Sequence, residues 1–382
     1  MDTAVEGKPV ELPDHRAAKE STSLGERLAA MHRQLLLDVP NVDRIGCALY
    51  DPDDDVLKTF VHSTLSGEAL RGYEYKLSAS RSLLELARRG GRRLLPDIPA
   101  AITPRNAHSV WLLEEGYRTS LTLPMYGQGA FTGLLFFDSR QPDAFSGAQQ
   151  RHLELFANLV SLLIAAELLS IRALAGSVGV ARAFCDLRDF ETGTHLERMS
   201  RYARLAAKEL APDRGLTDEF VELVFLFAPL HDVGKIGIPD HILLRPGPLA
   251  GADWETMKTH VDRGSAVLEK MISDLALNDL PSVAVLRNIV AYHHEFLDGS
   301  GYPQGVRGDA IPLEARIVTV ADVFDALTSP RPYKPAWAFA EAFAELDRMV
   351  AAGKLDPTVV AALRRQSDEA RAVRERYSDD RS

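Results

Sequence analysis

The signals for β-strands nearly vanish from this chain after about residue 170, and this change limits what the chain can fold into. Up to that point the sequence contains short alternating runs that are typical of half-buried strands. Beyond it, helical patterns dominate. A chain of 382 residues is long enough for two or three domains. The sequence therefore predicts a multidomain protein, in which an α+β domain with an antiparallel sheet precedes an all-α helical bundle.

Two hairpins mark the N-terminal domain, which is predicted at residues 24–165. The clearer hairpin turns at the run GQG (127–129), and the other has an acidic loop between its strands. Ser146 and Gln149 form a capping box that opens a long helix. Residues 1–23 are polar and are predicted to be poorly ordered. Strands are expected at 44–51, 56–62, 120–126 and 130–138, and shorter helices at 24–37 and 82–89.

The second domain is predicted at residues 177–365. A connecting helix at 166–190 leads into it, and a charged, solvated tail at 366–382 follows it. Gly353 and Pro357 punctuate its end. Helical patterns are found at 177–190, 195–211, 217–233, 253–272, 281–293, 313–328 and 338–351.

Histidine and carboxylate residues recur along the second domain in a pattern typical of a metal centre. Glu191 and His195 are four residues apart and share one helix face, and a His-Asp pair and a His-His pair follow. A lone helical histidine is more often structural, but this set combines imidazole and carboxylate ligands that suit Fe, Mn or Zn. The absence of cysteine ligands favours a hydrolytic centre over a structural zinc site. The candidate metal ligands are Glu191, His195, His231, Asp232, His260, His293, His294 and Asp322.

Basic and glycine residues accompany these ligands. Lys235 closely follows the His-Asp pair, and Arg331 and Lys334 follow the last ligand. A solvated surface position is usual for Lys and Arg, but in this otherwise acidic chain we expect the three residues to contact phosphate. Gly234 and Gly237 leave room for the close approach of a ligand or of a neighbouring helix.

Charge, cysteine content and hydropathy exclude several classes of protein. The net charge of −10 repels phosphate backbones, so general nucleic-acid binding is not expected. The two cysteines, Cys47 and Cys185, cannot form a disulfide framework, and the chain is expected to be cytoplasmic. Residues 153–175 are the most apolar stretch, but their polar residues fall at helical intervals, which favours an amphipathic helix over a membrane span. Cys47 is interpreted as a small core residue, with a pocket-lining role as the alternative.

The motifs of the second domain resemble those of the HD-GYP family. HDVGKIGIPDHILLRPGPL (231–249) precedes HHEFLDGSGYPQGVRGDAIPLEARIVTVADVFDALTSPRPYK (293–334), and together they cover nearly the whole domain. The resemblance implies an HD-type helical bundle that hydrolyses the bacterial second messenger cyclic di-GMP, to pGpG or on to GMP. It also implies two or three divalent metal ions, for which the mix of imidazole and carboxylate ligands favours Fe or Mn.

The resemblance further implies a role for each candidate residue. One metal ion would be held by His195, His231, Asp232 and Asp322, and a second by Asp232, His260, His293 and His294. Glu191 matches a glutamate of members that bind three ions. Substrate would be bound by Lys235, Arg331, Lys334 and Tyr302, and the candidate catalytic residues are Asp232, Lys235 and Asp325. Asp325 would either lie near the bridging water or orient a basic neighbour.

Three positions depart from the family pattern. Phe296 stands where the usual motif after the paired histidines has arginine. Pro229 precedes the His-Asp pair, where it would strain a continuous helix. Arg245 stands where lysine is common. None of these departures removes a metal ligand, but Phe296 puts the contact with substrate or with a partner protein in doubt.

The first domain resembles a GAF sensory domain, most of all in GLLFFDSRQPDAFSGAQQRHLELFANLVSLLIAAEL (133–168). The resemblance implies an unidentified small-molecule ligand, whose binding would be passed on through the helix at 146–190. A homodimer and contacts with signalling proteins are expected as well. The leucine-rich face of this helix either forms a dimer seam or packs within its own domain. The residues of this face are Leu155, Leu159, Leu162, Ile164, Leu168 and Leu169.

Three functions remain open from the sequence. The first is a metal-dependent cyclic di-GMP phosphodiesterase that its GAF domain regulates. The second is a hydrolase of another cyclic dinucleotide or of a different phosphate ester. The third is a catalytically weak cyclic di-GMP receptor or interaction module, for which a complete ligand set would be unnecessary.

Overall fold

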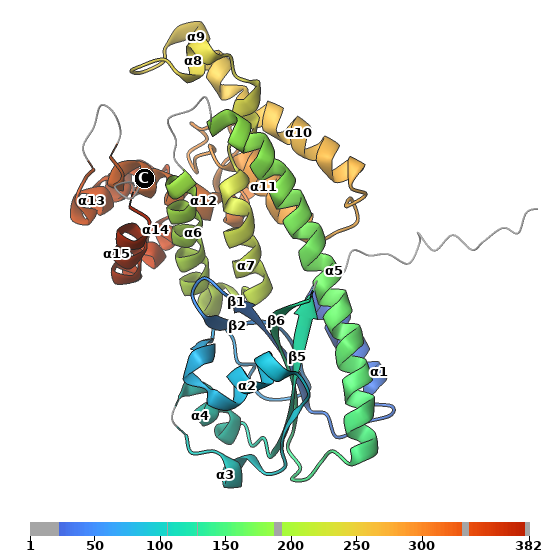
Figure 1. Ribbon diagram of the computed structural model, residues 1–382. Coiled ribbons are helices and arrows are strands. Elements are labelled where there is room, and N and C mark those ends of the chain that lie inside the picture. The colour runs from blue at the N-terminus through green and yellow to red at the C-terminus, as the bar shows by residue number, and fades with distance from the viewer. Residues whose placement is uncertain (1–22, 105, 128, 187–192, 331–335, 379–382) are drawn as a thin grey trace, which may run out of the picture.

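The computed structural model describes residues 23–104, 106–127, 129–186, 193–330 and 336–378. The N-terminal domain contains a sheet, and the C-terminal domain is helical. Figure 1 shows the two domains at opposite ends of the molecule, with helix α5 (Gly147–Asp186) running along both. The predicted fold class, an α+β domain with an antiparallel sheet followed by a helical bundle, is confirmed.

Six antiparallel strands form the sheet, in the order β3-β2-β1-β6-β5-β4. The central pair, β1 and β6, is buried on both faces. Ile45 and Phe137 point into one core, and Ala48 and Leu134 point into another. The strands β3 and β4 were not predicted, because three residues are too few to show an alternating pattern. The strands are β1 (Arg44–Asp51), β2 (Val56–Thr64), β3 (Glu74–Lys76), β4 (Arg93–Leu95), β5 (Thr119–Gly127) and β6 (Ala130–Ser139).

Helices cover both faces of the sheet. On one face, α1 (Leu24–Leu35) and the first part of α5 share a core with β1, β2, β5 and β6. On the other face, α2 (Arg81–Arg89) packs against the buried side chains of β1 and β6. The helices α3 (Ile98–Ala101) and α4 (Ala107–Glu114) follow β4 in the chain and contact each other.

Helix α5 begins at the predicted capping box and is long because nothing interrupts it. The Ser146 amide donates to Gln149 Oε1 at 2.9 Å, and the Gln149 amide donates to Ser146 Oγ at 3.4 Å. The inner face of α5 is buried and carries Glu167, which pairs with Arg27 of α1. The segment Gly147–Ser177 is long and apolar enough to cross a membrane, but a helix packed on a domain core passes the same test.

The helical domain packs around one hydrophobic core, in which Tyr202 of α6 and Phe324 of α12 meet with ring centroids 5.2 Å apart. The first four helices are α6 (Gly193–Arg214), α7 (Asp218–Phe227), α8 (Asp240–Leu243) and α9 (Gly251–Lys258). They are followed by α10 (His260–Asp274), α11 (Ser282–Tyr292), α12 (Leu313–Thr328), α13 (Phe339–Ala351), α14 (Pro357–Arg365) and α15 (Ser367–Arg376). Short 3₁₀ segments include η3 (Ala228–Leu230) and η4 (Val233–Gly237).

Three segments differ from the sequence expectations. The helical pattern at 253–272 is two helices, because α9 ends at Lys258 and α10 begins at His260. The helical pattern at 217–233 is not one helix, because α7 ends at Phe227 and the 3₁₀ turn η3 follows. Pro229 lies in this turn, where it strains no α-helix. Residues 367–376 were assigned to a solvated tail but form helix α15, whose Ala370 is buried in the core of the domain.

The two domains meet at a charged surface between the edge of the sheet and α6. Glu74 of the edge strand β3 pairs with Arg204 at 2.6 Å and with Lys208 at 3.3 Å. Asp54, in the turn between β1 and β2, pairs with Arg201 at 3.2 Å. These three basic residues are spaced three and four apart, so they share one face of α6. Burial by itself raises the pKa of Glu74, but Arg204 and Lys208 outweigh burial and hold it below its ordinary value.

Helix α7 adds two contacts between the domains through its first turn. The Gly72 amide, just before β3, donates to Asp218 Oδ1 at 2.8 Å. The Leu24 amide, at the start of α1, donates to Glu219 Oε1 at 3.3 Å. Helices α6 and α7 therefore both hold the N-terminal domain.

Candidate metal centre

Two groups of metal-ligating side chains lie next to each other in the helical domain. Within each group, the ligand atoms lie within 4.8 Å of one another. The first group is His195, His231 and Asp322, and the second is Asp232, His260, His293 and His294. Helices α6, α10 and α12 and the ends of η3 and α11 supply them, so the fold gathers ligands that are up to 127 residues apart in the chain. The eighth candidate ligand, Glu191, lies outside the described residues.

Asp232 lies at the junction of the two groups. Its Oδ2 is 3.2 Å from His231 Nε2, in the first group. Its Oδ1 is 3.1 Å from His260 Nε2 and 3.5 Å from His293 Nε2, in the second. Asp232 Oδ1 and His231 Nε2 are buried and have no hydrogen-bond partner among the described residues. Metal ions between these atoms would satisfy them, and each carboxylate oxygen faces a different group.

The imidazoles are oriented by hydrogen bonds on their far side. The Nδ1 atom lies close to the backbone carbonyl oxygen of a residue one turn earlier, at 2.9 Å for His231, 2.8 Å for His260 and 3.1 Å for His293. A carbonyl oxygen only accepts, so Nδ1 must carry the proton and the lone pair of Nε2 faces the centre. This is the tautomer that a metal ligand requires, and the residues present therefore fit divalent metal ions.

The charges of the centre also suit metal binding. Burial lowers the pKa of His293 and of His294, which favours their neutral form. Burial by itself raises the pKa of Asp232, but the Lys235 ammonium and His231 outweigh burial and hold the pKa well below its ordinary value. Lys235 Nζ lies 2.9 Å from Asp232 Oδ2. The centre thus combines two imidazoles whose neutral form is favoured, His293 and His294, with an ionised carboxylate and one adjacent cation.

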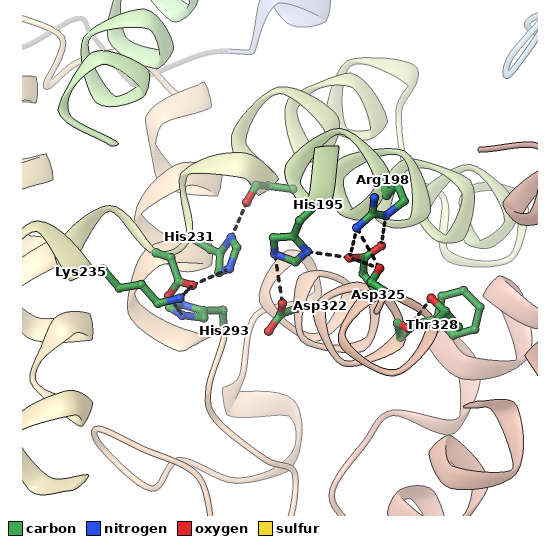
Figure 2. Close-up of polar contacts among 12 residues, drawn as sticks. His195, Arg198, His231, Lys235, His293, Asp322, Asp325 and Thr328 are labelled. Atoms are coloured by element: carbon green, nitrogen blue, oxygen red, sulfur yellow. Dashed lines mark hydrogen bonds and ion pairs between the residues drawn. The ribbon is translucent and has the colours of Figure 1, made fainter. Parts of the chain in front are cut away.

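A buried ion pair behind the first group holds His195 in place (Figure 2). Asp325 of α12 accepts from His195 Nδ1 at 2.7 Å, and its two oxygens accept from the Arg198 guanidinium at 2.7 and 3.1 Å. Asp325 is 1% exposed and Arg198 is 2% exposed. These contacts favour the second of the two predicted roles for Asp325, the orientation of a basic neighbour. Arg198 was not among the candidate residues predicted from the sequence. Its position one helical turn after His195 is the sequence feature that could have identified it.

The short segment after the His-Asp pair packs closely on α10. A Cβ atom on Gly234 would lie 1.8 Å from His260 O and 2.4 Å from the Gly264 amide nitrogen. Backbone therefore meets backbone at this point, which fits the predicted close approach of a neighbouring helix. Since His260 is the first residue of α10, this contact also sets the position of a ligand in the second group.

We expect the substitution Gly234→Ala to destabilise the protein by about 1–3 kcal/mol, because the added methyl group pushes α10 away. His260 moves with α10, so the second group is expected to bind less metal. Denaturant unfolding and metal counting measure the two effects. The matched control is Gly176→Ala on an exposed turn of α5, where a Cβ would meet nothing within 4 Å. A Gly234→Ala variant as stable and as metal-rich as the control would contradict this packing.

The glycine-rich loop at 298–303 forms a wall beside the second group. The ring of Tyr302 lies 4.7 Å from that of His294, centroid to centroid, and burial raises the pKa of Tyr302. Glu295 holds the loop, because its Oε1 accepts from the amides of Gln304 at 2.7 Å and Gly305 at 3.0 Å. Tyr302 thus lies beside the second group of ligands.

Four further positions were named from the sequence: Arg331, Lys334, Phe296 and Arg245. Arg331 and Lys334 fall outside the described residues. Phe296 is half-buried against the helical core, and Lys354 Nζ lies 5.3 Å from its ring centroid. Phe296 therefore packs as a core side chain at the position where the family pattern has a cation. Arg245 is exposed and pairs with Asp253.

Comparison with protein families assigns both parts of the chain. Residues 190–359 match the model of the HD domain, and residues 21–165 match the model of the GAF domain. Among solved structures, a GAF domain/HD domain protein from Geobacter sulfurreducens is 18% identical, with a TM-score of 0.32 over 38% of this chain and 94% of that one.

Several curated relatives match about half of the chain. The cyclic di-GMP phosphodiesterase response regulator RpfG of Xanthomonas campestris is 48% identical over 49% of this chain and 46% of its own length. A cyclic di-GMP phosphodiesterase of Vibrio cholerae is 39% identical, over 52% of this chain and 40% of its own length. The 3′3′-cGAMP-specific phosphodiesterase 2 of the same organism is 38% identical, over 51% of this chain and 35% of its own length. The chain spans less than half the length of each of these relatives.

Proposed function

We propose that this chain, which joins a GAF domain to an HD domain, is a metal-dependent phosphodiesterase that hydrolyses cyclic di-GMP to pGpG, GMP or both. One observation carries the proposal: the carboxylate of Asp232 lies between the two groups of ligands, within 3.5 Å of the Nε2 atoms of His231, His260 and His293. The names of the relatives support this substrate class. Two or three divalent ions, Fe or Mn, fit the mix of imidazole and carboxylate ligands, with Glu191 as the candidate ligand of a third.

The residues of the centre would have different roles in phosphodiester hydrolysis. When bound, paired divalent ions lower the pKa of a water molecule and stabilise the charge on a phosphate. His195, His231 and Asp322 would hold one ion, and His260, His293 and His294 the other, with Asp232 shared. Lys235 would place its ammonium beside a phosphate oxygen, where a fixed positive charge stabilises the transition state. Arg331 and Lys334 are proposed as further phosphate contacts, and Tyr302 as a wall against a base or ribose.

A second candidate substrate is 3′3′-cGAMP, because a relative named for that specificity is 38% identical. The two substrates carry the same phosphodiester ring and differ in one base. The deciding experiment is an anaerobic turnover assay on protein of known metal content, with both dinucleotides and with chromatographic separation of products. Cyclic di-GMP turned over faster supports the proposal, and 3′3′-cGAMP turned over faster replaces the substrate. No turnover of either by fully metallated protein would favour a receptor.

We propose that the GAF domain regulates the centre through α6. This helix carries His195 at its start, and its Arg204 and Lys208 pair with Glu74 of the N-terminal domain. A shift in the edge strand β3 would therefore pull on the helix that holds a metal ligand. Both ends of this route are described, and α6 is a single helix between them.

Replacing Glu74 with glutamine is expected to lower turnover about 5-fold or more, within the usual range of coupling between sites. The reason is that Arg204 and Lys208 lose their shared counter-charge, so α6 is no longer held against β3. Metal content is expected to stay unchanged. Glu68→Gln, on an exposed loop of the same domain, is the control. Unchanged turnover in Glu74→Gln would remove this route of regulation.

We also propose that the chain forms a homodimer through α5. Of the predicted seam, Ile164 and Leu168 pack inside their own domain. The other four leucines are exposed by 50% or more and are spaced by four, three and seven residues, which is the repeat of a coiled coil. They are Leu155, Leu159, Leu162 and Leu169.

The double substitution Leu159→Lys and Leu162→Lys is expected to convert the dimer to a monomer, because paired ammonium groups cannot be buried in an apolar seam. Light scattering over a range of protein concentrations measures the mass. Leu65→Lys is the control, since Leu65 is 50% exposed and directly follows β2. A wild-type chain that stays monomeric at every concentration would rule the seam out.

A further inference from the structure

A cavity lies in the N-terminal domain, apart from the metal centre. It has a volume of about 240 Å³ and is lined by β1, β2 and residues from the segments around α2 and α4. Its wall is mainly apolar, with Cys47, Leu57, Leu83 and Leu112 among the lining residues. An apolar cavity of about 150 Å³ is large enough to hold benzene. This one therefore has room for a molecule of one or two rings.

Aromatic rings surround part of the cavity. Tyr73 and Tyr75 are stacked, with ring centroids 6.3 Å apart and planes at 15°. His108 lies 5.7 Å from Tyr73 and 5.9 Å from Phe136, centroid to centroid. All four residues line the cavity. Faces and edges of rings in this arrangement favour a planar aromatic ligand over an aliphatic one.

Two guanidinium groups line the same cavity, and only one of them is neutralised. Arg44 pairs with the buried carboxylate of Asp138 at 2.5 Å. The side chain of Arg93 makes no ion pair or hydrogen bond with any residue in the described part of the chain. Burial lowers the pKa of Arg93, and burial and Arg44 lower the pKa of His108 to about 4, so His108 is neutral at pH 7. Among the described residues that line the cavity, Arg93 is therefore a positive charge without an ion-pair partner.

We propose that this cavity binds a small aromatic anion, with its ring among Tyr73, His108 and Phe136 and its anionic group at Arg93. A half-buried guanidinium in an apolar wall loses hydration, and a charged acceptor replaces that loss with strong hydrogen bonds. An aromatic anion satisfies both the rings and the charge. Any effect of this ligand on turnover rests on the proposed sensory role of the GAF domain. Binding of the ligand does not, because it is measured without any reaction.

Isothermal titration of the full chain tests the proposal with benzoate, indole-3-acetate and phenyl phosphate as probes. Benzamide and indole-3-acetamide are the neutral counterparts of the two carboxylates, and phenol is that of phenyl phosphate. We expect at least one anion to bind, and its neutral counterpart to bind about 10-fold or more weakly, as for hydrogen bonds to a charged group. The phosphate and carboxylate probes identify which anionic group fits. If no anion binds, or if the amides bind as well as the carboxylates, the proposal is wrong.

Variants of Arg93 locate the binding. Arg93→Gln is expected to remove the preference for the anion, and Arg93→Lys to retain part of it. Arg92→Gln is the matched control, since Arg92 is the preceding residue, is partly exposed and pairs with Glu154 instead. An Arg93→Gln variant that still prefers the anion would overturn the assignment. Absence of cyclic di-GMP turnover in the assay under Proposed function would not change the binding of these probes. A failure of the proposed function can therefore be distinguished from a failure of this proposal.

Discussion

The substitution Asp232→Ala is expected to lower turnover of cyclic di-GMP about 10³-fold or more. Metal ions contribute several kcal/mol to stabilising a phosphodiester transition state, and each 1.36 kcal/mol is tenfold in rate. Asp232 is the one described residue whose carboxylate oxygens face both ligand groups, at 3.1 to 3.5 Å from three imidazole nitrogens. Its loss is therefore expected to lower metal occupancy in both groups. Chromatography of products and elemental counting of metal measure the two effects.

The control for this substitution is Asp262→Ala. Asp262 is exposed on α10, two residues after His260, so its loss removes a carboxylate near the centre but outside it. We expect the control to keep its metal and its turnover. Full turnover with a normal metal count in Asp232→Ala would show that the centre is not where the reaction takes place.

The substitution Asp325→Asn is expected to weaken metal binding by the first group about 10- to 100-fold, the usual effect of losing an outer partner of a histidine ligand. An asparagine side chain has one acceptor oxygen, which cannot serve both His195 and Arg198. The charge of Arg198 attracts that oxygen and turns the amide NH₂ group toward His195 Nδ1, which favours the wrong tautomer. Metal titration, read separately for the first and second ion, measures the change.

Arg198→Met separates this positioning role from a general loss of stability. Breaking a buried ion pair costs about 3–5 kcal/mol, so both variants are expected to unfold at lower denaturant concentration. Only Asp325→Asn alters the partner of His195 Nδ1, so only that variant is expected to lose affinity for the first ion more than tenfold. Equal losses of metal affinity in the two variants would make Asp325 a structural residue alone.

Much of the fold follows from local patterns. The strand predicted at 44–51 and the helix predicted at 313–328 match β1 and α12 to the residue, since each is a long, regular pattern with clear turn or proline boundaries. The single helix predicted at 217–233 was wrong, because apolar residues continue through Leu230, beyond the end of α7 at Phe227. Periodicity records which side chains are buried, and a buried 3₁₀ turn looks the same as a further turn of α-helix.

Part of the candidate site could likewise be predicted from the sequence, and part could not. The two ligand groups could be predicted because motifs carry their residues as a set. The bond between His195 and Asp325 could not, because it joins residues 130 apart in the chain. No local pattern distinguishes an aspartate that holds a histidine from one that faces solvent. The ion pairs between Glu74 and α6 likewise form only where the two folded domains meet. In the sequence these residues look like ordinary surface charges.

Helix α5 passes from the sheet of the first domain into the second without a break. Each residue added to such a helix turns everything after it by about 100°, so a single insertion would swing the helical domain and the exposed leucines to different sides. Seven added residues restore the direction to within about 20°. Helix α5 thus sets the rotation of one domain relative to the other as well as the distance between them. A chimaera that exchanges either domain within α5 must preserve that rotation.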